Sequence, residues 1–237
     1  VDKTILDKLN IKSKEPKLND WKRVVRAKLL PEREVNVSFV GKYTELKDSY
    51  KSINEALEHA GIKNKAKVNI NFVQAEDLTS RNVRKILKKA DAVLVPGGFG
   101  QRGVEGMILA CQFARENNIP YLGICLGMQV AIIEYARNVL KLKNANSTEF
   151  NPKTKFPVIG LVTEWKDKSG NTEYRDDSSD LGGTMRLGGQ TCILRKSSLS
   201  HKLYKDNKII ELINKKKIKT LAPYKLVKTM RAGVLVL

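Results

Sequence analysis

Cys125 occupies a position where a cysteine can act as a nucleophile. The stretch YLGICLGMQV, residues 121–130, places it between Gly123 and Gly127 in the arrangement G-x-C-x-G. The apolar residues before it predict a buried strand and the residues after it predict a helix, so the chain must turn sharply at the cysteine. Flanking glycines relieve the side-chain clashes of such a turn. The pattern is the cysteine counterpart of the G-x-S-x-G nucleophile elbow.

The predicted helix after Cys125 would supply further catalytic groups. Its free N–H groups and its positive dipole end favour the thiolate, which is the reactive form of cysteine. The N–H of Leu126, the next residue, is placed to donate to an oxyanion. The alternative interpretation is a small apolar residue in a tight strand–helix junction. The glycine on each side and the strand–helix context favour the nucleophile.

A second glycine-rich segment, PGGFGQRG, covers residues 96–103 and follows another predicted strand. Gly97, Gly98, Gly100 and Gly103 would let the backbone approach a ligand and present N–H groups to it. Gly98 is a natural second oxyanion donor. The alternative is a flexible loop between a strand and a helix.

The other cysteines and the histidines give weaker signals. Cys111 lies among apolar helix residues and Cys192 lies in a strand-like run, so both are predicted to pack in the core. No cysteine–histidine spacing typical of a metal site occurs, and we predict no metal site. Neither His59 nor His201 is followed by a suitably spaced acidic residue, so we expect neither to serve Cys125 as a base.

These residues are set in an alternation of strands and helices. The predicted strands cover 34–41, 67–73, 91–95 and 119–124, and the predicted helices cover 46–61, 80–90, 104–118 and 126–140. Such alternation predicts an α/β fold with an open, mostly parallel sheet and helices on both faces. Ligands bind such sheets at the carboxyl ends of the strands, where both glycine clusters fall. Further on, a strand is predicted at 156–162 and an extended stretch at 184–194, with a polar loop between them.

The composition is that of a globular protein with an excess of lysine. The 237 residues carry 44 lysines and arginines against 25 acidic residues, a formal net charge of +19. The lysines are spread along the whole chain with few aromatic residues between them, which favours solvated helix faces over a nucleic-acid surface. No apolar stretch long enough to span a membrane and no secretory signal are visible, and three scattered cysteines suggest no disulfide framework. We therefore expect a cytoplasmic protein with neither a nucleic-acid nor a membrane partner.

Several long strings together closely resemble the glutamine amidotransferase domain of the CTP synthase family. They are VPGGFGQRGVEGMI, FARENNIPYLGICLGMQVAIIEYARNVL, NANSTEF and SDLGGTMRLGGQ, while EVNVSFVGKYTELKDSYKSINEALEHAG resembles the start of that domain. The resemblance implies a class I glutamine amidotransferase with a flavodoxin-like sheet. It also implies the end of a synthetase domain and a linker in residues 1–34, an incomplete amidotransferase domain in 35–204, and a divergent lysine-rich tail in 205–237.

The resemblance also implies roles for particular residues. The family hydrolyses glutamine and passes the ammonia to a synthetase domain, which makes CTP from UTP with ATP in pyrimidine nucleotide biosynthesis. Carried over by motif, Cys125 would form the glutamyl thioester, and the N–H groups of Gly98 and Leu126 would bind the oxyanion. Glu149, in NSTEF, would meet the ammonium group of glutamine. The residues that would line the glutamine site are Gly98, Leu126, Gly127, Met128, Gln129 and Glu149.

Two departures from the family bear on activity. The synthetase domain is not in this sequence, so we expect no cofactor here and place ATP and magnesium on that domain; the family also takes GTP as activator and forms tetramers. The family's later His-Arg-His-Arg-Tyr-Glu and His-Pro-Glu segments, which hold the catalytic histidine and glutamate, are not found, and no His-x-Glu exists in the chain. We expect the chain alone to be weakly active or inactive. A frameshift, a truncation or gene decay would each explain the tail, and the alternative function is a non-catalytic remnant that assembles with intact CTP synthase subunits.

Overall fold

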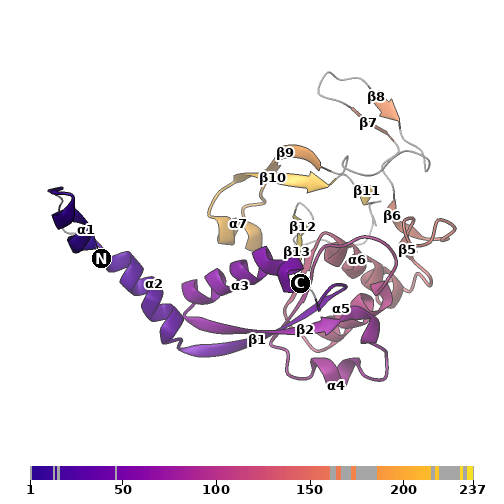
Figure 1. The fold of residues 1–237 in the computed structure, drawn as a ribbon. Coiled ribbons are helices and arrows are strands. Elements are labelled where there is room, and N and C mark those ends of the chain that lie inside the picture. Colours follow the sequence, from indigo (N-terminus) through magenta and orange to yellow (C-terminus); the bar gives the residue numbers. More distant parts are fainter. Residues whose placement is uncertain are drawn as a thin grey trace. The chain divides into compact units, whose positions relative to one another are not determined.

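A computed structural model gives the fold of the chain (Figure 1). It describes residues 2–12, 14, 17–45, 47–160, 164–166, 172–174, 186–214, 217–218, 230–231 and 234–236. The chain divides into two compact units: Val1–Val35 with Ser52–Val68, and Asn36–Lys51 with Asn69–Leu237.

The first unit is largely helical and has an open surface. It contains α1 (Asp2–Lys8), α2 (Asn19–Leu29), most of α3 (Lys51–Lys63), and the first residues of β1 (Arg33–Gly41) and β2 (Ala66–Gln74). No residue of α2 is buried. The ion pair Lys67–Glu34, at 3.1 Å, joins the starts of the two strands, and Lys28 pairs with Glu58 between α2 and α3. The side chains of these pairs are at least half exposed, so each pair adds little stability.

The second unit is built on a sheet with the strand order β12-β13-β4-β3-β1-β2. Strands β1, β3 (Ala92–Val95) and β4 (Tyr121–Ile124) run parallel, with Phe39 opposite Leu94 and Val95 opposite Gly123. The predicted α/β fold with a mostly parallel sheet is confirmed. Beside β4 lies β13 (Val234–Val236), which is antiparallel to it and pairs in turn with β12 (Met230–Arg231).

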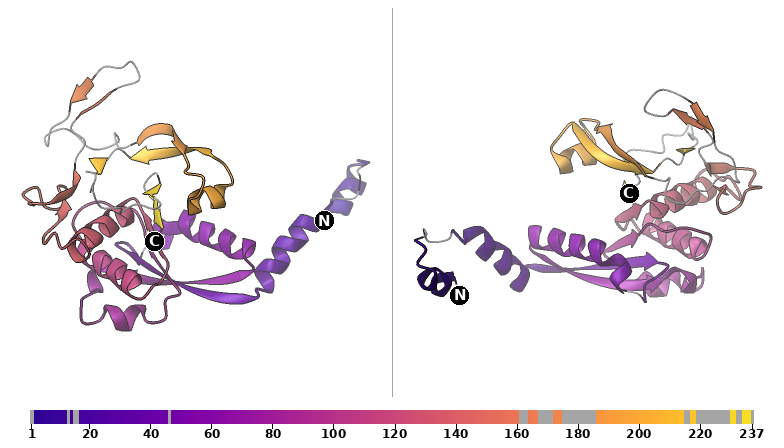
Figure 2. Two further views of the ribbon diagram at one scale, coloured as in Figure 1. Left: turned by 180° about the vertical axis from the view of Figure 1, so that it is seen from behind. Right: turned by 45° about the horizontal axis from the view of Figure 1, so that its top comes forward.

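The main helices of this unit pack on the parallel strands. Helices α5 (Val104–Glu116) and α6 (Leu126–Asn138) lie side by side (Figures 1 and 2). They contact each other, and both contact β3 and β4. Most residues of both helices are buried, because each crossover helix covers a strand that must itself be shielded from water. Burial of these apolar side chains is the main stabilising contribution in the unit.

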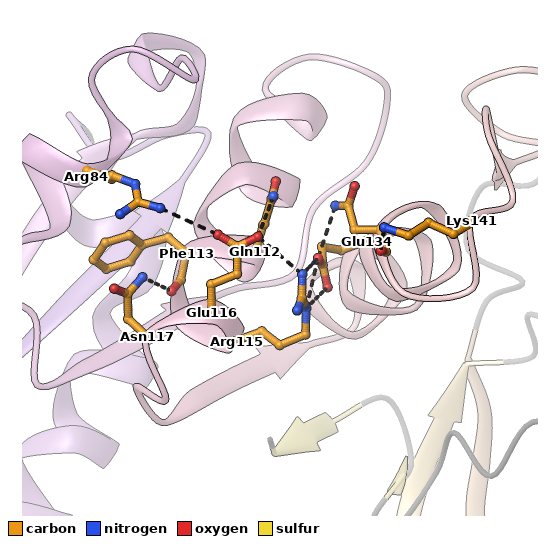
Figure 3. A network of polar contacts seen from close by, with 9 residues as sticks. Arg84, Gln112, Phe113, Arg115, Glu116, Asn117, Glu134 and Lys141 are labelled. Carbon is orange, nitrogen blue, oxygen red and sulfur yellow. Dashed lines mark hydrogen bonds and ion pairs between the residues drawn. The ribbon is translucent and has the colours of Figure 1, made fainter.

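A charged pair is enclosed between these two helices (Figure 3). Arg115 on α5 donates from Nε and Nη2 to the carboxylate of Glu134 on α6, at 2.8 to 3.1 Å. Asn138 Nδ2 also donates to Glu134, at 3.1 Å. The Glu134 hydrogen bonds and burial act oppositely on Arg115, and the hydrogen bonds prevail, so the pKa of Arg115 is raised. Since Glu134 is fully buried, the pair fixes how the two helices meet.

The described elements of the remaining chain form small antiparallel or mixed sheets. They are β5 (Asn146–Ser147) with β6 (Pro157–Gly160) and β11 (Lys217–Ile218), β7 (Glu164–Lys166) with β8 (Thr172–Tyr174), and β9 (Arg186–Ile193) with β10 (Lys208–Asn214), and α7 (Leu199–Tyr204) lies between β9 and β10 in the chain. No strand–helix unit was predicted in the lysine-rich tail. In the structure, this tail supplies β10, β11, β12 and β13. Residues 161–162 of one predicted strand and most of the polar loop after it lie outside the described residues.

Two predicted helices differ in extent from those observed. The helix predicted over 46–61 is a 3₁₀ turn, η1 (Lys47–Tyr50), that continues directly into α3. The helix predicted over 80–90 is only α4 (Val83–Leu87). No side chain caps the start of α4: Asn82 precedes the helix, and its side-chain oxygen accepts from Thr79 N. A second 3₁₀ turn, η2 (Ala75–Asp77), follows β2.

Candidate active site

Cys125 forms a one-residue turn between β4 and α6. Strand β4 ends at Ile124 and α6 begins at Leu126. Cys125 has φ 53° and ψ −102°, in a region that non-glycine residues rarely adopt. Holding a side chain in such a conformation costs about 1 to 3 kcal/mol, and such strain gathers at functional sites. The predicted sharp turn at the candidate nucleophile is therefore present.

Gly123 and Gly127 are required by close packing rather than by their own backbone angles, since neither has a positive φ. A Cβ added to Gly123 would lie 2.6 Å from the carbonyl carbon and oxygen of Gly127. A Cβ added to Gly127 would lie 2.1 Å from the carbonyl oxygen of Val95. The glycines let the first turn of α6 pack directly on the backbone of β4 and β3. Relief of side-chain clashes within the turn, predicted from the sequence, is therefore only part of the reason for these two glycines.

Tyr121, the first residue of β4, holds the first turn of α6 through a hydrogen bond. Its hydroxyl donates to the carbonyl oxygen of Gly127 at 2.8 Å, in a fully buried position. Burial raises the pKa of Tyr121 well above its usual value, so it stays a neutral donor. Tyr121 was not predicted from the sequence to support the turn at Cys125. An aromatic residue with a polar group at the start of a buried strand was the available signal, because such a hydroxyl needs a partner.

The glycine loop lies against the elbow. Because Val95 pairs with Gly123, the segments that follow β3 and β4 leave the same edge of the sheet. A Cβ added to Gly97 would lie 3.4 Å from Cβ and 4.0 Å from Sγ of Cys125. One added to Gly98 would lie 3.5 Å from Cδ2 of Leu126. The structure thus brings the two candidate oxyanion donors, Gly98 and Leu126, side by side next to the candidate nucleophile.

Lys42 enters this loop from the end of β1. It is only 2% exposed, and its Nζ donates to the carbonyl oxygens of Phe99, at 2.6 Å, and Gly100. Burial lowers the pKa of Lys42, while the nearby carboxylate of Glu149 acts in the opposite direction. Lys42 was not among the site residues predicted from the sequence. Its place just after a parallel strand, at the edge that carries both glycine clusters, was the signal that could have found it.

Glu149 reaches the same loop from the other side. Its Oε1 accepts from the main-chain N–H of Gly100 at 3.0 Å, and its own N–H donates to Ser147 Oγ at 3.2 Å. From the sequence, only the family resemblance singled out Glu149. Its partner Gly100 directly follows Phe99 and lies two residues after Gly98, so the Glu149 carboxylate is bound to the same loop that carries Gly98.

Met128 and Gln129 lie in the first turn of α6 and are buried. The N–H of Gln129 donates to the carbonyl oxygen of Cys125 at 3.2 Å, as the helix requires. Its side-chain Oε1 is buried and has no hydrogen-bond partner within the part of the chain that the structure describes. Buried acceptors are usually satisfied, so a partner for this oxygen is expected outside the described residues.

Comparison with known proteins decides the family. The profile of the family described as "Glutamine amidotransferase class-I" matches residues 45–222, most of the chain. The chain belongs to the class-I glutamine amidotransferase family. Among solved structures, this family member is similar to the glutaminase domain of Trypanosoma brucei CTPS with bound acivicin. The two share 37% sequence identity with a TM-score of 0.65, over 78% of this chain and 68% of that one.

The other candidate residues of this amidotransferase are accounted for as follows. Cys111 is fully buried in the core, as predicted, and burial raises the pKa of its thiol far above the usual value. The side chain of Cys192, on β9, lies outside the described residues. The His201 ring Nε2 is 2.9 Å from Asn207 Oδ1, and His59 lies on α3 in the first unit. That neither histidine serves Cys125 stays a prediction.

The described residues contain neither a candidate metal site nor a candidate membrane-spanning helix. No group of three histidine, cysteine or acidic side chains that could hold a metal occurs among the residues described. Within the same residues, no helix has the length and apolar character to cross a membrane.

Proposed function

We propose that this chain is the glutaminase portion of a CTP synthase. In this proposal it hydrolyses glutamine through a Cys125 thioester, and the ammonia is used for ATP-dependent amination of UTP to CTP. The observation that carries the proposal is the strained Cys125 turn packed against a glycine loop. Family membership and the similarity to the glutaminase domain of Trypanosoma brucei CTPS support it.

The chemistry follows from the groups around Cys125. The Cys125 thiolate attacks the side-chain amide carbon of glutamine. The oxygen of the tetrahedral intermediate gains negative charge, which the N–H groups of Gly98 and Leu126 stabilise in this proposal. The C–N bond then breaks, ammonia leaves with a proton taken up from solvent or from a general acid, and the glutamyl thioester remains. Water attacks the thioester and releases glutamate and the thiol.

The substrate's polar groups have matching partners in this proposal. The carboxylate of Glu149 binds the ammonium group of glutamine, where opposite charges pair. Gln129 Oε1, which has no partner among the described residues, accepts a hydrogen bond from the bound substrate in this proposal. Gly127 and Met128 complete the wall of the site along the first turn of α6.

We propose that turnover by this chain alone is slow. A triad enzyme needs a base oriented by a carboxylate, and removal of one triad member costs several orders of magnitude in rate. The sequence has no His-x-Glu, and His201 contacts an amide oxygen rather than a carboxylate. The strained cysteine and its oxyanion donors still permit thioester formation at a residual rate.

Further parts of the proposal concern groups outside residues 1–237. A synthetase domain would bind ATP, UTP and magnesium and would receive the ammonia. GTP would act as activator, and the assembly would be a tetramer in the cytoplasm.

The test is CTP formation from UTP, ATP and glutamine by this chain mixed with a separately produced synthetase domain. Glutamine-dependent CTP that disappears in Cys125→Ala, while CTP made from ammonium salts persists, is the expected result. Tight association with the synthetase domain without any glutamine-dependent CTP would favour the non-catalytic alternative. CTP formation equal in wild type and Cys125→Ala would overturn the proposed function.

A further inference from the structure

We infer that Lys42 is a positioning residue that clamps the Phe99–Gly100 peptide and thereby sets the glutamine-binding side of the loop. The inference deepens the proposed function and rests on it for the identity of the ligand. Lys42 does not touch the reacting atoms in this account. It acts through the loop that carries Gly98 and contacts Glu149.

The geometry of a single peptide plane is the first step. The C=O of Phe99 and the N–H of Gly100 belong to one trans peptide, in which they point in opposite directions. The oxygen accepts from Lys42 Nζ at 2.6 Å, and the N–H donates to Glu149 Oε1 at 3.0 Å. This plane is therefore held from both ends, by a cation on one side and a carboxylate on the other.

The loop needs such a clamp because of its composition. Gly100 has φ 75°, and a Cβ built on it would meet no described atom within 4 Å, so no side chain at this residue restricts rotation of the Phe99–Gly100 plane. Rotation would turn the Gly100 N–H away from Glu149. It would also move Gly98, two residues earlier, whose neighbours are Leu126 and the aliphatic part of the Lys42 side chain.

The burial of Lys42 indicates that its ammonium group is bound by specific protein groups. A lysine that is only 2% exposed is uncommon, since an ammonium group loses its hydration unless protein groups replace it. Here two consecutive carbonyl oxygens and the field of Glu149 replace that hydration. These replacement groups are all in or against the glycine loop, so the position of the ammonium group and that of the loop determine each other.

The consequence for binding is specific. Loss of the clamp should weaken the positioning of Glu149 and of the Gly98 N–H, both of which act on glutamine. It should leave the Cys125 turn intact, because that turn is fixed by Gly123, Gly127 and Tyr121. Recognition of a glutamine-like molecule should therefore suffer while the simple reactivity of the thiol does not.

The experiment compares Lys42→Met with Lys141→Met in the full chain. Lys141 is a matched control, because its Nζ also donates to a backbone carbonyl, that of Asn138 at 2.7 Å, but at an exposed position. Cys125 is labelled with acivicin, as a glutamine-mimicking electrophile, and separately with iodoacetamide, which needs no binding site. Hydrogen exchange of the peptide that contains residues 97–101 is followed in parallel.

For Lys42→Met we expect the half-saturating acivicin concentration to rise about tenfold, as for loss of one charge-assisted hydrogen bond. The iodoacetamide rate should stay within about twofold, and exchange at 97–101 should accelerate; Lys141→Met should match wild type. Lys42→Gln, which keeps a donor without the charge, should lie between.

Two results would overturn the inference. One is unchanged exchange at 97–101 in Lys42→Met, and the other is an equal loss of reactivity toward acivicin and iodoacetamide, which would indicate a general structural role. If the wild-type chain takes no acivicin at all, the proposed function fails. The exchange measurement still decides the clamp in that case, since it needs no ligand.

Discussion

The carbonyl oxygen of Val95 lies where a side chain on Gly127 would have to be. A Cβ built on Gly127 falls 2.1 Å from that oxygen, which belongs to strand backbone and cannot move aside as a flexible side chain can. Strand β3 and the first turn of α6 are therefore in direct backbone contact. This contact brings the glycine loop after β3 against the Cys125 turn.

Gly127→Ala tests this contact. We expect it to lower the free energy of unfolding by about 1 to 3 kcal/mol, as overpacking does, and to reduce acivicin labelling of Cys125. Gly160→Ala is the control, because no atom of the described residues lies within 4 Å of a Cβ at that position. Urea unfolding of both variants gives the comparison. Equal stability of the two would show that β3 and α6 are not packed as described.

Tyr121→Phe removes one hydroxyl that donates to Gly127 O in the core. The carbonyl loses its buried partner, so we expect a loss of about 0.5 to 1.5 kcal/mol in unfolding free energy and slower labelling of Cys125. Tyr43→Phe, at a half-exposed ring, serves as control. A fully stable Tyr121→Phe with unchanged labelling would remove the hydroxyl from the account of the elbow.

Arg115→Met leaves Glu134 buried without its cationic partner. We expect a loss of about 3 to 5 kcal/mol, as when one partner of a buried ion pair is removed. Arg23→Met breaks the pair with Asp20, in which both side chains are at least 80% exposed, and should change stability by less than about 1 kcal/mol. Thermal or urea unfolding distinguishes them. Similar small effects in both variants would contradict the burial assigned to Glu134.

Cys111 and Cys125 should differ sharply toward iodoacetamide at neutral pH. Burial raises the pKa of Cys111, and its neighbour Glu134 raises it further, so its reactive thiolate is scarce and inaccessible. Cys125 is partly exposed at the start of α6. Peptide mapping should find Cys125 modified in the native protein and Cys111 modified only after unfolding. Early modification of Cys111 would show that α5 is not packed as described.

The sequence was sufficient for features that depend on local patterns. Strand–helix alternation predicted the parallel sheet, and the G-x-C-x-G arrangement predicted the turn at Cys125. Contacts between distant segments left no local pattern. Lys42 and Glu149 are more than one hundred residues apart, yet they hold opposite ends of one peptide in the glycine loop.

Element boundaries failed for a related reason. The apolar spacing of 80–90 suits a longer helix than α4, but the Asn82 side chain bonds Thr79 N and Asp77 O, which favours a turn there. In the tail, β10 gains its pairing from β9, and no periodicity within the tail could reveal a partner located elsewhere.

Labelling of the native chain of residues 1–237 with acivicin, read by mass spectrometry of its peptides, tests the central claim most directly. The account predicts one adduct on Cys125, formed with saturation kinetics, suppressed by L-glutamine and not by D-glutamine, and absent from Cys125→Ala. An adduct that forms equally with and without L-glutamine, or no adduct on Cys125 while iodoacetamide still reaches it, would contradict the claim that Cys125 lies in a glutamine site.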